Sequence, residues 1–149
     1  MVFLSAICAF GQSMDNEKLQ SIIYTMSDTL AGEEGRWQFV VGELPMFCLT
    51  DETHNRMRII SPVAGVSEVE PDVLLKCLEA NFHSALDVRY SISDDVIWVA
   101  FIHPLRELSK DQVIDAVTQV YSAVATFGES YTSTSLTFPT NQESNPRLH

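Results

Sequence analysis

The fold is decided by an unbroken run of seven apolar residues in the second half of the chain, Val96-Ile97-Trp98-Val99-Ala100-Phe101-Ile102. A β-strand with one solvent-exposed face alternates apolar and polar residues, and this run does not alternate. We therefore expect a strand whose two faces are both covered. What covers the second of these faces is the main question about function.

The run lies within a segment, Leu74 to Phe127, whose pattern predicts a helix, a β-hairpin and another helix. Residues 87–93 alternate between polar and apolar, and Asp94-Asp95 supplies a tight turn into the run. The helix before the hairpin starts either at a capping box formed by Ser67 and Glu70 or with Pro71 in its first turn. Its expected buried stripe is Leu74, Cys77, Leu78, Phe82 and Ala85.

The helix after the run is expected to begin with a capping box formed by Ser109 and Gln112 and to end at Gly128. Its apolar residues recur at alternating spacings of four and three, which is typical of one buried helix face. These residues are Val113, Val117, Val120, Val124 and Phe127.

The first half of the chain predicts one helix and three strands. The helix spans residues 14–31, with Ser13 as its N-cap and Gly32 as its stop. Strands follow at residues 37–42, 46–49 and 56–60, with Pro45 in a turn and residues 61–69 as a connection around Pro62. Short links between successive strands favour antiparallel pairing. We therefore expect an α+β fold, with three helices and an antiparallel five-stranded sheet in the order α-βββ-α-ββ-α.

The chain ends carry separate expectations. Residues 1–12 contain a short apolar run that could be the remnant of an export signal, although no basic residue precedes it. If it is a signal, the protein is periplasmic or secreted; otherwise it is cytoplasmic. Residues 13–131 are expected to form a single domain, and residues 132–149 a mobile tail. The apolar run is too short for an integral membrane segment.

Composition limits the classes of partner. The 149 residues include 20 acids and 9 bases, which gives a formal net charge of −11. This charge repels phosphate backbones and anionic lipid surfaces, so we expect neither nucleic acid nor a membrane surface as the partner. It suits a soluble protein whose partner is neutral or basic. Cys48 and Cys77 lie in apolar runs, where free thiols act as small core residues, although a disulfide between them would suit an oxidising compartment.

The sequence offers no recognisable catalytic or metal-binding motif. The four histidines are His54, His83, His103 and His149, and none has a partner at metal-ligand spacing. There is no glycine-rich phosphate loop and no serine in a nucleophile elbow. Cys77 and His83 are six residues apart on one predicted helix, so they point in different directions and make a poor dyad. We expect no enzymatic activity and no cofactor.

The order of elements and the acidic charge resemble the type III secretion chaperone-like fold and its relative, the YbjN family. The residues that carry the resemblance are Leu75, Leu78, Asn81-Phe82, Ala85 to Tyr90, Val96-Ile97-Trp98, Ile102-His103-Pro104-Leu105, Leu108-Ser109, Val117 and Phe127-Gly128-Glu129-Ser130-Tyr131. The resemblance implies a bacterial, non-enzymatic module that binds a protein or peptide, as the acidic, homodimeric secretion chaperones do. An export signal would depart from this pattern, because those chaperones work in the cytoplasm.

The apolar run itself supports a partner on physical grounds. If three helices cover one face of the sheet, an entirely apolar strand leaves a hydrophobic strip on the other face, and such strips mark interfaces. Trp98, Ala100 and Ile102 share one face of the strand, and we expect them to contact the partner because tryptophan is enriched in binding hot spots. The alternative is that Trp98 is a core residue beneath the last helix.

Our first functional hypothesis is a chaperone-like homodimer that binds a protein or peptide. Two alternatives remain. One is a structural or regulatory dimer without a client. The other is a small ligand-binding protein or enzyme that uses the His103 end of the sheet.

Overall fold

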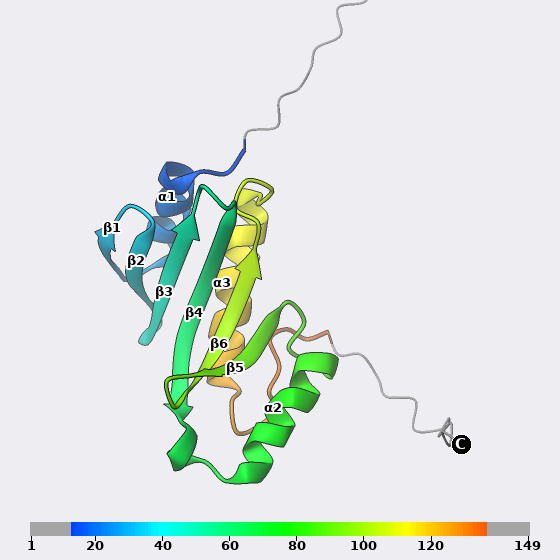
Figure 1. The fold of residues 1–149 in the computed structure, drawn as a ribbon. Helices are drawn as coiled ribbons and strands as arrows, with labels where there is room; N and C mark the ends of the chain where they lie inside the picture. The colour runs from blue at the N-terminus through cyan, green and yellow to red at the C-terminus, as the bar shows by residue number, and fades with distance from the viewer. Residues whose placement is uncertain (1–12, 137–149) are drawn as a thin grey trace, which may run out of the picture.

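The computed structural model describes residues 13–136, which form one antiparallel six-stranded sheet and three α-helices (Figure 1). The strand order across the sheet is β1-β2-β3-β4-β6-β5. The elements along the chain are α1 (Asn16–Met26), β1 (Thr29–Glu33), β2 (Arg36–Val41), β3 (Leu44–Asp51), β4 (Arg56–Gly65), the 3-10 helix η1 (Val66–Glu68), α2 (Pro71–His83), β5 (Val88–Ser93), β6 (Val96–His103) and α3 (Lys110–Ala125).

The predicted α+β class and antiparallel pairing are confirmed, but the predicted five-stranded sheet is wrong because it lacks β1. Leu30 continues the apolar spacing of the first helix, which is why the sequence predicts that this helix runs to residue 31. In the structure α1 ends at Met26, and β1 pairs with β2 along its whole length. Gly32 does not stop a helix: it has φ +118°, and a Cβ there would lie 2.2 Å from the carbonyl oxygen of Arg36.

Several expected boundaries also need correction. The N-cap of α1 is Asp15 rather than Ser13, because the Asp15 carboxylate accepts a hydrogen bond from the Lys18 amide at 2.9 Å. Pro45 lies inside β3, close to its start. The strand β4 runs to Gly65 through the expected connection, since Pro62 lies beside an irregularity in the pairing with β6, where a missing amide is tolerated.

The elements that flank the apolar run follow the sequence more closely. Pro71 occupies the first turn of α2, which decides between the two starts left open above. Asp94 and Asp95 both have positive φ and form the hairpin turn between β5 and β6. At the start of α3, Ser109 Oγ accepts from the Gln112 amide at 3.2 Å and Gln112 Oε1 accepts from the Ser109 amide at 2.8 Å. The predicted capping box is therefore confirmed.

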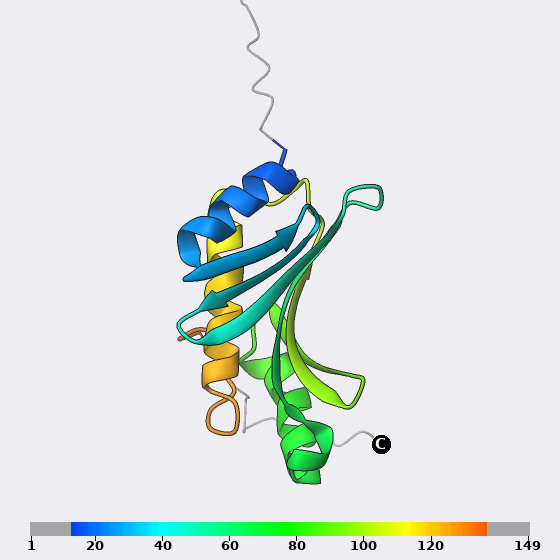
Figure 2. The same ribbon diagram turned by 90° about the vertical axis from the view of Figure 1, so that its left-hand side faces the viewer.

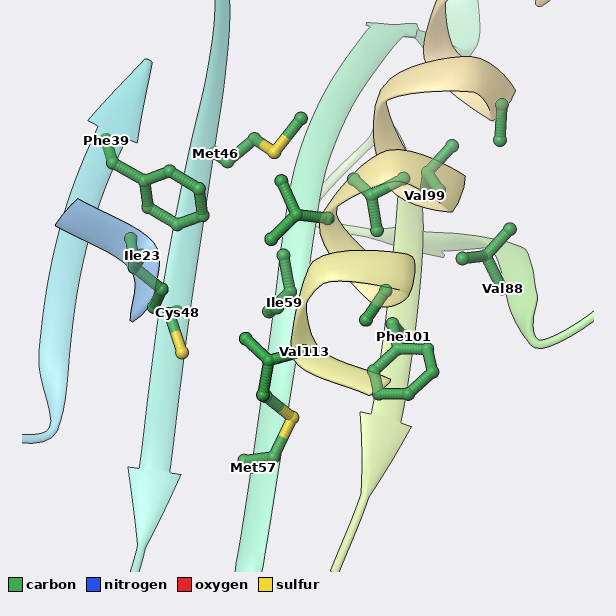
Figure 3. Packing of buried hydrophobic residues seen from close by; sticks show 14 of the residues in the cluster. Ile23, Phe39, Met46, Cys48, Met57, Ile59, Val88, Val99, Phe101 and Val113 are labelled. Atoms are coloured by element: carbon green, nitrogen blue, oxygen red, sulfur yellow. The ribbon is translucent and has the colours of Figure 1, made fainter. Parts of the chain in front are cut away.

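The core lies between one face of the sheet and the helices α1 and α3 (Figures 1 and 2). Five strands contribute one residue each to a buried row of register partners: Trp37, Cys48, Ile59, Phe101 and Val88. Figure 3 shows several of these side chains packed with Val113 of α3. In the predicted stripe of α3, Val113, Val117 and Val120 are fully buried, as the spacing predicts, while Val124 and Phe127 are partly buried. The helix ends at Ala125, earlier than the expected stop at Gly128.

The packed part of the chain extends past the expected domain boundary at Tyr131. Ser133 is buried, and its hydroxyl donates a hydrogen bond to the carbonyl oxygen of Ala85 at 2.7 Å. Residues 137–149 of the expected tail, and the expected leader at 1–12, lie outside the described residues. Among the described residues, none of the helices has both the length and the apolar character needed to cross a bilayer.

Candidate functional site

The two faces of β6 have different surroundings. Ile97, Val99 and Phe101 point into the core beneath α3 and are almost entirely buried. Side chains alternate along a strand, so Trp98, Ala100 and Ile102 point to the opposite side of the sheet. We call this side the open face, because no helix of the described residues covers it and Figure 1 looks directly onto it. The expectation that both faces of the run are covered is therefore not met within residues 13–136.

The centre of the open face is apolar. Trp98 is half-buried, and its ring meets that of Phe47 edge to face at a centroid distance of 6.3 Å. Its indole Nε1 donates a hydrogen bond to the Ser93 carbonyl oxygen at 3.2 Å, which fixes the ring across the hairpin. Pro62 of β4 is the register partner of Trp98, and Ile60, another β4 residue, belongs to the same face.

The three residues expected to contact a partner differ in accessibility. Ile102 is 58% exposed, and Trp98 presents part of its ring. Ala100 is only 9% exposed, because its small side chain lies between those of its register partners Ile60 and Arg89. Trp98 and Ile102 therefore offer the accessible apolar area, while Ala100 contributes little to it.

A second apolar surface lies on α2, where the predicted buried stripe is partly wrong. Cys77 is buried and Leu74 is partly buried, as expected, but Leu78 is exposed and Phe82 is 79% exposed. Leu75, Leu78 and Phe82 follow spacings of three and four, so they form one stripe on the outside of the helix. Together with the exposed Ile92 of β5, these residues make up what we call the α2 surface.

The sequence contained a signal for the α2 surface. Apolar residues on α2 occupy two neighbouring stripes, one through Leu74 and Cys77 and one through Leu75, Leu78 and Phe82. A helix packed against the edge region of a sheet can bury only one such stripe, so the other remains outside. In the structure α2 packs against β5, and the stripe through Leu74 and Cys77 is the one that faces the sheet.

A groove of about 310 Å³ lies between α2 and the β5–β6 hairpin. It is lined by Leu74, Cys77, Leu78, Tyr90, Ser91, Ile92 and Ile97, which are almost all apolar. Burial raises the pKa of the Cys77 thiol, so it stays protonated near neutral pH and is a poor nucleophile. Burial also raises the pKa of the Tyr90 hydroxyl, which donates a hydrogen bond to the Ala123 carbonyl oxygen at 2.7 Å.

The other cysteine and histidine side chains that could take part in catalysis or metal binding make structural contacts instead. Cys48 and Cys77 are both free and buried, and burial raises the pKa of Cys48 to about 12. The ring of His103 stacks on Phe101 at the end of β6, and its Nδ1 donates to the Pro104 carbonyl oxygen at 2.8 Å. Within residues 13–136, no three His, Cys, Asp or Glu side chains come together as a metal site would require.

Among the solved structures that resemble this fold are two complexes. One is the HopA1-SchA chaperone-effector complex, with a TM-score of 0.58 and 10% sequence identity over 73% of this chain and 88% of that chain. The other is the ExsC-ExsE complex, with a TM-score of 0.58 and 11% identity over 74% of this chain and 92% of that chain. No protein-family model matches the chain. No curated protein matches it either.

At such low identity these likenesses show the fold alone. They confirm the secretion chaperone-like fold that the sequence predicted, with one strand more than expected. Membership of the YbjN family is not shown and stays a prediction.

Proposed function

We propose that this chain is a non-enzymatic, chaperone-like module of bacterial origin, related to the YbjN family, that binds a protein or peptide partner. The observation that carries the proposal is the open face of β6. The apolar run of β6, residues 96–102, has one face in the core and the other left uncovered by the described helices. Contiguous apolar surface of this kind is typical of a protein-binding site. The fold shared with chaperone-effector complexes supports the same conclusion.

Trp98 and Ile102 are the proposed contact residues on the open face, with Ala100 between them. Trp98 is held by its hydrogen bond to Ser93 and by its contact with Phe47, so it presents a fixed ring rather than a mobile one. A fixed aromatic ring loses little conformational entropy on binding, which favours its use as an anchor. Ala100 allows a partner side chain to approach the sheet closely.

The module is proposed to be a homodimer that associates through the α2 surface. Leu75, Leu78 and Phe82 present three large apolar side chains on one side of α2, and Ile92 borders them across the groove. A two-fold interface brings the same patch of both subunits together, so this surface would be buried against its own copy. This arrangement leaves the open face of each sheet available to the partner, because the α2 surface lies on the helical side of the molecule.

Affinity capture from the native source tests the proposal. Full-length wild-type chain, Trp98→Ser and Tyr24→Ser are immobilised in parallel, and captured proteins are identified by mass spectrometry. Tyr24 is an exposed aromatic residue on α1, away from both surfaces, and serves as the matched control. We expect a protein that is retained by wild type and Tyr24→Ser but lost with Trp98→Ser. Equal retention by all three chains would contradict the assignment of the open face.

A further inference from the structure

The open face carries an unusual share of the positive charge of this acidic chain. Arg36, Arg56, Arg58 and Arg89 all belong to it by register, and they are four of the nine basic residues. On the same side of the strands lie only two of the 20 acidic residues, Glu33 and Asp51.

The arginines are arranged in register with apolar residues. Reading across the sheet from β2 through β3 and β4 to β6, the register partners are Arg36, Leu49, Arg58 and Ile102. We call these four residues the arginine row. All four are exposed. Because neighbouring strands lie about 4.8 Å apart, the two arginines are about 10 Å apart, with an apolar side chain between them.

The guanidinium groups of the arginine row have no carboxylate partner in the described part of the chain. The ion pairs found there involve Lys18, His54 and Lys76, and none involves an arginine. Arg56 donates a hydrogen bond to the carbonyl oxygen of Asn55, and Arg89 donates to those of Leu86 and Val88. Glu33 is the register partner of Arg36 and Asp51 that of Arg56, yet neither pair forms an ion pair. Asp51 is instead hydrogen-bonded to His54 at 2.7 Å.

We propose that the partner bound on the open face is an acidic peptide segment, in which Asp or Glu residues flank aliphatic or aromatic ones. The proposal rests on the proposed function and specifies the chemistry of its partner. The apolar centre of Phe47, Ile60 and Trp98 receives the apolar side chains, and Arg36 and Arg58 receive the carboxylates. Arginine suits this role because its planar guanidinium binds carboxylates in a bidentate manner.

The positive charge of the open face favours an acidic peptide over a second copy of the same face and over a nucleic acid. A second copy of the same face would place the arginine rows against each other in an isologous contact, which like-charge repulsion disfavours. The net charge of −11 favours a neutral or basic partner, but the open face itself is locally positive, with four arginines and two acids on its strands. A nucleic acid carries a negative charge on every phosphate, so most of its length would lie in the repulsive field of the acidic chain, whereas a short peptide places only a few carboxylates against Arg36 and Arg58. An acidic peptide with apolar residues is complementary to both the arginine row and the apolar centre.

A display selection with random dodecapeptides on the immobilised full chain tests the proposal. We expect the selected peptides to be enriched in Asp and Glu beside apolar residues and depleted in Lys and Arg, relative to the starting library. A synthetic, fluorescently labelled peptide from the selected pool should bind more weakly as ionic strength rises, since salt screens exposed charges. The anisotropy of this labelled peptide gives its dissociation constant for each variant.

Arg58→Glu and Lys110→Glu form the matched pair of variants, because each changes the net charge by the same amount. Lys110 is exposed at the start of α3, on the opposite side of the sheet. We expect Arg58→Glu to raise the dissociation constant of the selected peptide about tenfold, while Lys110→Glu should bind the peptide as wild type does. Arg36→Glu provides an independent second variant, and circular dichroism checks that each variant is folded.

The outcomes separate this inference from the proposed function. Neutral or basic selected peptides, or equal binding of an acidic peptide by wild type and Arg58→Glu, would overturn the acidic partner and leave peptide binding intact. Recovery of no peptide at all would overturn both. A labelled single-stranded oligonucleotide that binds wild type and loses affinity with Arg58→Glu would overturn the peptide in favour of nucleic acid.

Discussion

Replacing Phe82 by serine should dissociate the proposed homodimer while leaving the protomer folded. Phe82 is 79% exposed, and it touches the ring of His83 rather than the core. Complete burial of a phenylalanine side chain stabilises an association by about 1.5–3 kcal/mol, so covering the exposed part of Phe82 is worth about 2 kcal/mol. A two-fold interface contains the residue twice, which makes the expected loss about 4 kcal/mol, or about a thousandfold in the dimer dissociation constant.

Sedimentation equilibrium of the full chain over a range of concentrations measures this constant. Tyr24→Ser is the control, since Tyr24 is 70% exposed on a helix outside the α2 surface and undergoes a similar loss of aromatic area. Phenylalanine and serine have similar helix propensities, so denaturant unfolding of the Phe82→Ser protomer should change little. A wild-type chain that stays monomeric throughout, or a dimer that Phe82→Ser leaves unchanged, would refute the reasoning.

Three further predictions concern stability. Trp37→Phe should lower the free energy of unfolding in urea by only about 1 kcal/mol. Trp37 Nε1 is buried without a hydrogen-bond partner in the described residues, so its removal relieves a desolvation penalty and offsets part of the cost of the smaller side chain. A decrease as large as that expected for the cavity alone would contradict this. Ser109→Ala should lower the free energy of unfolding by about 1 kcal/mol, because it removes one half of the capping box. The double variant Ser109→Ala with Gln112→Ala should lose less than the sum of the two single losses, and a strictly additive loss would argue against the capping box. The pKa of the Cys48 thiol is raised on folding to about 12, so the folded state holds this proton more tightly than the unfolded state does. The contribution of the protonated Cys48 thiol to the free energy of unfolding should therefore be fully present below pH 9 and be lost as the pH rises towards 12. The decline should be shallower in Cys48→Ala, and an identical pH profile for both chains would refute the raised pKa of Cys48.

The sequence predicted best where burial and periodicity coincide. The valines of α3 and the hairpin turn at Asp94 and Asp95 follow their sequence patterns closely, because each pattern is compatible with only one local structure. The apolar run predicted a strand, and it forms β6, which is paired on both sides by β4 and β5. Its two faces could not be told apart from sequence, since both are apolar and only the packing of α3 decides which one is buried.

The errors arise where local pattern and tertiary contacts disagree. Leu30 continues the spacing of α1, yet it belongs to β1, an edge strand with little burial to mark it in the sequence. Pro62 suggested a connection, but pairing with β6 carries β4 past it through an irregularity. The arginine row was also out of reach, because it depends on the register between strands and not on spacing along any one of them.

Fluorescence of Trp98 is the most direct test of the claim that the open face is uncovered and binds a partner. In the Trp37→Phe variant of the full chain, Trp98 is the remaining tryptophan. Acrylamide should quench its emission in the free protein, and saturation with the selected acidic peptide should shift the emission to shorter wavelength and reduce quenching. Emission from the free protein that is already protected from acrylamide would contradict the claim, because the chain itself would then cover Trp98.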